Sequence, residues 1–184
     1  MGGDIRRCAI FGQSTMCFKW GFDEEDKECC RMKLGLLQKI MELRQQDVTQ
    51  FLVACDHGVG LYAAEQINAL RQADSDLMLF CTIPHEEQAT KWASYLRERY
   101  FKMLEDCTGI DCISLYARTG AQLLAYRRII DLSDIVLTVF DSEAFAAGRM
   151  EEKALIYALN SRKPVINLDP YTLTVSRIDK PDDR

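Results

Sequence analysis

The sequence predicts a single α/β domain with a doubly wound, mostly parallel sheet. Three observations support this prediction. The length of 184 residues suits one domain. Short apolar runs recur along the whole chain, as expected for strands that are buried on both faces. Segments with helical periodicity separate these runs, and such an alternation favours parallel strands joined by helical crossovers.

The expected strands are the six short runs in which apolar residues dominate. They cover residues 8–11, 51–55, 77–83, 111–115, 135–140 and 164–168. The expected helices lie between them, and their apolar stripes place them around residues 36–43, 59–73, 86–104 and 150–159. In the longest of these, Trp92 shares a stripe with Ala89 and Leu96, which favours a core position for Trp92 over a stacking platform for a base.

The end of the chain is expected to form an appendage to this domain. Residues 173–178 alternate between apolar and polar, which is typical of an edge strand, and a charged tail contains Pro181. We therefore assign residues 1–170 to the α/β domain and residues 171–184 to a C-terminal edge strand and tail. No linker, repeat or second domain is expected.

The charge of the chain argues against two classes of partner. Acidic residues outnumber basic ones by 28 to 23, and the net charge is -5, so binding to nucleic acid is not expected. No apolar run approaches the ~18 residues that a spanning helix needs. Neither a membrane segment nor a signal peptide is therefore expected.

The eight cysteines predict a cellular compartment rather than a metal site. Without an export signal, thiols in this number are expected to be reduced, and the protein is expected to be cytoplasmic. The spacing lacks paired CxxC knuckles, since it offers only the vicinal Cys29 and Cys30 and the looser Cys107 and Cys112. No metal and no cofactor are expected.

The loops that follow the strands are the candidate ligand site. In an open parallel sheet the ligand lies at the carboxyl ends of the strands, so these loops converge on one edge. They are rich in glycine, hydroxyl and amide groups, as recognition of an anion or a sugar requires. The five loops cover residues 12–15, 56–60, 84–88, 116–120 and 141–148.

The most specific motif is a strand that runs directly into Gly58-x-Gly60 and a helix. With Ala63 as a third small residue, it forms the pattern GxGxxA, which is typical of a phosphate cradle. The same glycines could instead serve only the packing of a tight turn. A conventional dehydrogenase is not expected, because Asp74 and Asp76 precede the next strand, whereas ribose binding needs an acid at its end.

Two histidines fall in these loops. His57 and His85 could each donate to a phosphate or act as a general base, and both could equally be exposed loop residues. No serine or cysteine occupies a nucleophile elbow, so a histidine-assisted triad is not expected.

Four longer segments carry a family resemblance when they are taken together. ACDHGVGLYAAE, IPHEEQATKW, RRIIDLSDIVLTVFD and ALIYALNSRKPVINLDP resemble, in order and spacing, the YpsA/YoqJ-like branch of the SLOG superfamily. The resemblance spans residues 8–170. It implies a Rossmann-like fold and kinship with the LOG phosphoribohydrolases, the DNA-processing DprA proteins and sensors of nucleotide-derived signals.

The resemblance also adds residues to the candidate site. Gly58 and Gly60 match the glycine turn of the branch, and Pro84, Gln88 and Trp92 match its Pro, Gln and Trp pattern. Arg127 and Arg128 fall where the branch has Arg-Asn, and Asp141 ends the strand that follows. The full set of expected ligand-binding residues is Gly12, Gln13, Ser14, Thr15, Asp56, His57, Gly58, Gly60, Pro84, His85, Gln88, Tyr116, Arg127, Arg128, Asp141, Gly148 and Arg149.

Two loops depart from the family pattern. The opening loop, residues 11–15, lacks the Thr-Gly-His-Arg-Pro type of sequence. The later Gly-Gly-Thr turn, which cradles phosphate, is reduced to Gly148 and Arg149 after an alanine. Arg149 could replace amide contacts with a charged contact to phosphate, although an arginine at a helix start is more often only exposed.

Three functions remain open from the sequence. The first is binding of a nucleotide or nucleotide-derived small molecule, such as an ADP-ribose-like signal, by a sensor, carrier or sequestering protein, with Gln88, Tyr116 or Tyr126 recognising sugar or base. The second is hydrolysis of an N-glycosidic bond, with Glu151 or Glu152 as the carboxylate and Arg128 as the phosphate partner. Acidic residues are also common in the first turn of a helix for reasons of charge alone.

The third function is an interaction protein with a degenerate pocket, tied to cell division as the resemblance implies. The damaged glycine turn favours binding over hydrolysis, because catalysis requires closer positioning of the substrate than binding does. A homo-oligomer, a dimer or higher, is expected from the resemblance.

Overall fold

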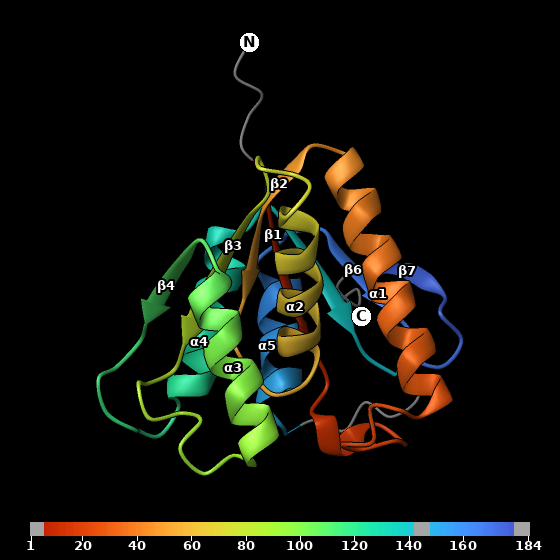
Figure 1. Ribbon diagram of the computed structural model, residues 1–184. Coiled ribbons are helices and arrows are strands. Elements are labelled where there is room, and N and C mark those ends of the chain that lie inside the picture. The colour runs from red at the N-terminus through yellow and green to blue at the C-terminus, as the bar shows by residue number, and fades with distance from the viewer. Residues whose placement is uncertain (1–5, 142–147, 179–184) are drawn as a thin grey trace.

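The computed structural model describes residues 6–141 and 148–178, and these residues form an α/β fold around one sheet (Figure 1). The strands run in the order β4-β3-β2-β1-β5-β6-β7. All neighbouring pairs are parallel except β6 and β7. The strands are β1 (Arg6–Gly12), β2 (Val48–Val53), β3 (Met78–Ile83), β4 (Gly109–Cys112), β5 (Ile135–Val139), β6 (Val165–Leu168) and β7 (Val175–Ile178). The prediction of a mostly parallel, Rossmann-like sheet is confirmed.

Helices cover both faces of the sheet (Figure 1). The helices are α1 (Lys27–Gln45), α2 (Val59–Arg71), α3 (Ser94–Asp106), α4 (Ala121–Leu132) and α5 (Met150–Asn160), with a short 3-10 helix η1 (Thr15–Cys17) after β1. Cys8 and Ile10 of β1 pack into the core under α1, α2 and α3, whereas Ala9 and Phe11 pack under α4 and α5. This alternation reflects the period of two along a strand, and it makes β1 buried on both faces.

The topology places a crevice between β1 and β5. The helix that follows β1 lies on one face and the helix that follows β5 lies on the other, so the chain diverges at the carboxyl ends of these two strands. Ligands bind at such a switch point in open α/β sheets. Among the described residues, no helix combines the length and the apolar character that crossing a membrane requires.

The largest difference from the expected elements concerns residues 86–104. Helix α3 begins only at Ser94, and turns precede it, with the amides of Gln88 and Trp92 donating to carbonyl groups three residues earlier. Ala89 and Trp92 therefore do not share a helix with Leu96. Two smaller differences are that β4 lies at 109–112 instead of 111–115, and that α4 was not predicted as a separate helix.

Candidate functional site

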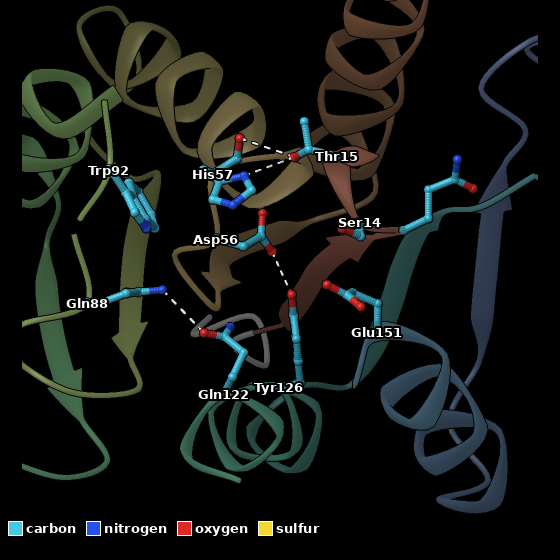
Figure 2. A pocket seen from close by; sticks show the side chains of 10 residues that line it. Ser14, Thr15, Asp56, His57, Gln88, Trp92, Gln122, Tyr126 and Glu151 are labelled. Atoms are coloured by element: carbon cyan, nitrogen blue, oxygen red, sulfur yellow. Dashed lines mark hydrogen bonds between the residues drawn. The ribbon is translucent and has the colours of Figure 1, made fainter. Parts of the chain in front are cut away.

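A cavity of about 200 Å³ lies at the carboxyl ends of β1 and β2, beside the first turns of α4 and α5 (Figure 2). Polar side chains dominate its wall. The lining residues are Gln13, Ser14, Thr15, Asp56, His57, Gln88, Trp92, Gln122, Tyr126 and Glu151. The structure thus brings together side chains from loops that are far apart in sequence. The position of the cavity is the one that the strand order predicts.

Asp56 lines this cavity, and its carboxylate also accepts hydrogen bonds from backbone amides at the start of helix α2. Oδ1 accepts hydrogen bonds from the amides of Gly58 and Gly60, at 2.9 and 3.1 Å. Oδ2 accepts one from the hydroxyl of Tyr126, at 2.9 Å. Burial raises the pKa of Tyr126 well above its usual value, so this hydroxyl remains a donor. The chain's own carboxylate therefore occupies the place that the glycine motif predicts for a phosphate.

The two glycines of this turn make room for side chains of the protein. A Cβ at Gly58 would lie 2.7 Å from Oγ1 of Thr15, and a Cβ at Gly60 would lie 3.1 Å from Oδ1 of Asp56. The approach of Thr15 and Asp56 to the backbone therefore requires glycine, or a shift of these side chains, at the two positions. The packing explanation of the motif accounts for both residues.

The amide side chains of Gln88 and Gln122 lie on the side of the cavity opposite Glu151 (Figure 2), and Gln13 is a further amide of the lining. Nε2 of Gln88 donates to the carbonyl of Cys55 at 3.0 Å and to Oε1 of Gln122 at 3.3 Å, while Nε2 of Gln122 reaches the carbonyl of Ala54 at 3.3 Å. Oε1 of Gln13 accepts from the amide of Asp141 at 2.8 Å. In the described part of the chain, Oε1 of Gln88 and Nε2 of Gln13 are buried without a hydrogen-bond partner. The cavity lining thus contains one acceptor atom and one donor atom without a hydrogen-bond partner.

His57 joins the polar wall to a group of aromatic rings. Its Nδ1 lies 3.1 Å from Oγ1 of Thr15. Its ring centre lies 5.2 Å from the rings of both Phe22 and Trp92. Trp92, expected in the core, is only partly buried and lines the cavity. The turns before α3 place it there, since they remove Trp92 from the helical stripe on which the core prediction depended.

The neighbours Glu151 and Glu152 have different environments. Oε2 of Glu152, which is buried, accepts from the amide of Arg149 at 3.0 Å and so caps helix α5. Glu151 faces the cavity instead (Figure 2). Burial, and then the nearby charge of Asp56, raise the pKa of Glu151 above its usual value. Of the two carboxylates considered from the sequence, only Glu151 can reach a ligand in this cavity.

Several predicted site residues lie outside the cavity wall. Arg127 and Arg128 are exposed; Arg127 stacks over the ring of Tyr157, and Nε of Arg128 donates to Asp111 at 2.9 Å. The other predicted residues outside the lining are Gly12, Gly58, Gly60, Pro84, His85, Tyr116, Asp141, Gly148 and Arg149. Of these, four residues are buried, namely Gly12, Gly58, Gly60 and Pro84. Residues 142–147 of the last predicted loop lie outside the described residues.

Gln122 is the lining residue that sequence reasoning missed. It precedes Tyr126 by four residues on α4, and side chains at that spacing share one face of a helix. Tyr126 was named as a candidate for sugar or base recognition, so this spacing could have identified Gln122 as well. Among the described residues, no group of His, Cys, Asp or Glu side chains could hold a metal ion.

Comparison with known proteins assigns the chain to a family. The family described as the YspA SLOG family (YpsA) matches residues 9–173. The chain is 29% identical over 124 residues to the UPF0398 protein BH1768 of Halalkalibacterium halodurans, and 28% identical over 123 residues to a UPF0398 protein of Bacillus cereus. Each alignment covers 66% of this chain and 66% of the relative, just under two thirds. The match to the family extends from β1 to the segment before β7, and it shows that this chain belongs to the YpsA family of SLOG proteins.

Proposed function

We propose that the cavity binds the sugar of a nucleotide or nucleotide-derived small molecule, such as an ADP-ribose-like signal, and that the protein acts as a sensor, carrier or sequestering protein. The observation that carries this proposal is the pair of unpartnered amide atoms, Nε2 of Gln13 and Oε1 of Gln88, in a wall that also holds two carboxyl groups. A buried polar atom without a partner is costly, and a bound ligand would relieve that cost.

The arrangement suits hydroxyl groups better than phosphate. An ionised carboxylate has about four acceptor positions. The structure gives Asp56 three hydrogen bonds, from Gly58, Gly60 and Tyr126, which leaves room for a sugar hydroxyl. The amides of Gly58 and Gly60 are already engaged, and no lysine or arginine among the described residues belongs to the lining. We therefore place the sugar, and not the phosphate, of the ligand next to Asp56.

The test is a calorimetric titration and melting screen with ADP-ribose, AMP, adenosine and ribose 5-phosphate. A ligand that binds only the native state should raise the free energy of unfolding by about 2.7 kcal/mol at a hundred times its dissociation constant. The variant Gln88→Ala should lose binding, whereas the control Gln72→Ala, at an exposed position at the end of α2, should not. Absence of binding by all four compounds would contradict the proposal and favour an interaction protein with a degenerate pocket.

One observation favours hydrolysis of an N-glycosidic bond as a second candidate. Glu151 is a cavity carboxyl with a raised pKa, which is a common property of a general acid. Arg128, the expected phosphate partner, lies outside the cavity and is paired with Asp111. We therefore expect chromatography to recover the four compounds unchanged. Repeated turnover that is lost in Glu151→Gln and retained in Glu152→Gln would establish the hydrolase instead.

A further inference from the structure

A second hollow, of about 420 Å³, adjoins the polar cavity and is lined mainly by apolar groups. Its aromatic side chains are Phe22, Trp92 and Tyr95, joined by His57, Lys91 and Leu96. His57 and Trp92 also line the polar cavity, so the two hollows share a wall. A ligand that passes these two side chains contacts polar groups on one side and aromatic rings on the other.

The rings of this hollow are accessible. Phe22 is 41% exposed and Tyr95 is 50% exposed, and both line this one hollow. Trp92 is supported from behind by Tyr100, a fully buried residue whose ring centre lies 5.1 Å away. The hollow therefore presents the ring of Trp92, whose position is fixed by packing against the buried Tyr100.

An ion-pair network fixes the segment that carries Phe22. Glu24, two residues further on, accepts hydrogen bonds from Arg99 at 2.6 Å and from Lys33. Arg99 also pairs with Glu65 at 2.7 Å. Burial alone would raise the pKa of Glu24, but the hydrogen bonds from Arg99 and Lys33 outweigh it and hold the pKa below its usual value. The network ties this segment to α1, α2 and α3.

We propose that this hollow binds the heteroaromatic base of the same ligand whose sugar occupies the polar cavity. The inference rests on the proposed function and deepens it, because it names the part of the ligand that selects for a nucleoside over a plain sugar phosphate. A nucleoside joins a hydroxyl-rich sugar to a flat aromatic base whose faces can stack. In the same way, the first hollow is lined by polar groups and the second mainly by aromatic and aliphatic ones. Stacking on aromatic side chains accepts any base, since every base has a π-face.

The experiment compares AMP with ribose 5-phosphate, in which a hydroxyl group stands at the sugar carbon that carries adenine in AMP. Calorimetry is carried out on the wild type, on Phe22→Ala and Tyr95→Ala, and on the control Phe101→Ala, an exposed aromatic position of α3 outside both hollows. We expect AMP to bind the wild type more tightly than ribose 5-phosphate. Each of the two hollow variants should weaken AMP binding about tenfold and leave ribose 5-phosphate unaffected. Quenching of tryptophan emission by AMP should disappear in Trp92→Phe and persist in Trp20→Phe.

The outcomes separate this inference from the function on which it rests. If AMP binds with equal affinity to the wild type and to both hollow variants, the sugar site stands and the base site is wrong. If Phe22→Ala changes the mass measured by light scattering while the affinity for AMP stays constant, the hollow is a contact between copies of the chain. If no compound of the panel binds the wild type, the proposed function fails, and this inference fails with it.

Discussion

Two glycine-containing turns precede helices α2 and α5, and in each a carboxylate is hydrogen-bonded to the backbone. The carboxylate comes from a different position relative to the helix in the two cases. At α2, Asp56 reaches forward from outside the helix, and its carboxylate also faces the cavity and bonds Tyr126. At α5, Glu152 reaches back from within the helix, and its carboxylate is buried. Each helix start thus has a carboxylate of the chain bonded to its backbone, but only the first of these carboxylates also lines the cavity.

The difference shows how a phosphate-type motif can serve another purpose. The amides at a helix start attract any anion, and an acidic side chain close in sequence has a large advantage over a dissolved one. At α2 the internal anion adds a carboxylate to the cavity wall. At α5 the internal anion is Glu152, and the preceding glutamate, Glu151, faces the cavity.

The strongest way to break this comparison is to remove the cap at α2. Asp56→Ala should lower the free energy of unfolding by about 2–3 kcal/mol, since it deprives two amides and the buried Tyr126 hydroxyl of their acceptor. Asp56→Asn, which keeps an oxygen, should lose less. Inorganic phosphate should then stabilise Asp56→Ala and not the wild type, as urea denaturation would show. A loss below about 0.5 kcal/mol would mean that the cap is dispensable.

The next test substitutes one glycine in each turn. Gly58→Ala should cost about 2 kcal/mol, because its Cβ would meet Thr15 at 2.7 Å. At Gly148 no heavy atom of the described residues lies within 4 Å of the new Cβ, but its φ of +150° disfavours a side chain, so Gly148→Ala should cost about 1 kcal/mol. Thermal denaturation in a Thr15→Ala background should show a smaller cost for Gly58→Ala only. Equal costs in both backgrounds would contradict the assigned contact.

The cap at α5 can be tested through its own glutamate. Glu152→Ala should lower the free energy of unfolding by about 1 kcal/mol, the usual value of a lost helix cap. Glu152→Gln should be nearly neutral, because an amide oxygen can accept the same bond. Lys153→Ala, at the exposed next position, serves as the control in urea denaturation. Equal effects of the alanine and glutamine variants would rule out the capping role.

The smallest expected effect distinguishes Glu151 from its neighbour by pH. Its raised pKa means that the folded protein holds this proton to higher pH than the unfolded chain, so the free energy of unfolding falls as the pH rises from about 4.3 toward the folded value. Glu151→Gln cannot ionise. Its stability relative to the wild type should therefore increase across this window and then level off. A difference that is constant from pH 4 to 8 in urea denaturation would disprove the assigned environment.

The sequence predicted where a cavity would lie better than which residues would line it. Because parallel strands end at one edge, the loops after β1 and β2 had to meet, and Gln13, Thr15, Asp56 and His57 do line one cavity. The glycine pattern does not show which anion binds the backbone amides of the turn, a ligand phosphate or a carboxylate of the protein. An aspartate two residues before Gly58 is typical of a side chain that bonds its own turn, and this signal could have identified the cap.

Helix geometry explains two further differences between the predicted residues and the cavity lining. Tyr126 faces the sheet from α4, so the next two positions, Arg127 and Arg128, lie about 100° and 200° further around the helix and reach solvent. Glu151 and Glu152 are likewise adjacent and chemically alike in sequence. Only the position of α5 against the sheet decides which of them caps the helix and which faces the cavity.

The central position of β1 also has a consequence for the order of events on the ribosome. β1 pairs with β5, and the amide of Arg7 donates a hydrogen bond to a carboxylate oxygen of Asp134, which lies 127 residues further along the chain. The cavity lies at the carboxyl ends of β1 and β2, and its last wall residue in sequence, Glu151, is on α5. A nascent chain therefore cannot assemble the site until most of it has been synthesised, and contacts this distant in sequence form slowly. Ligand present during synthesis should consequently protect the finished chain from proteolysis without protecting its partly synthesised precursors.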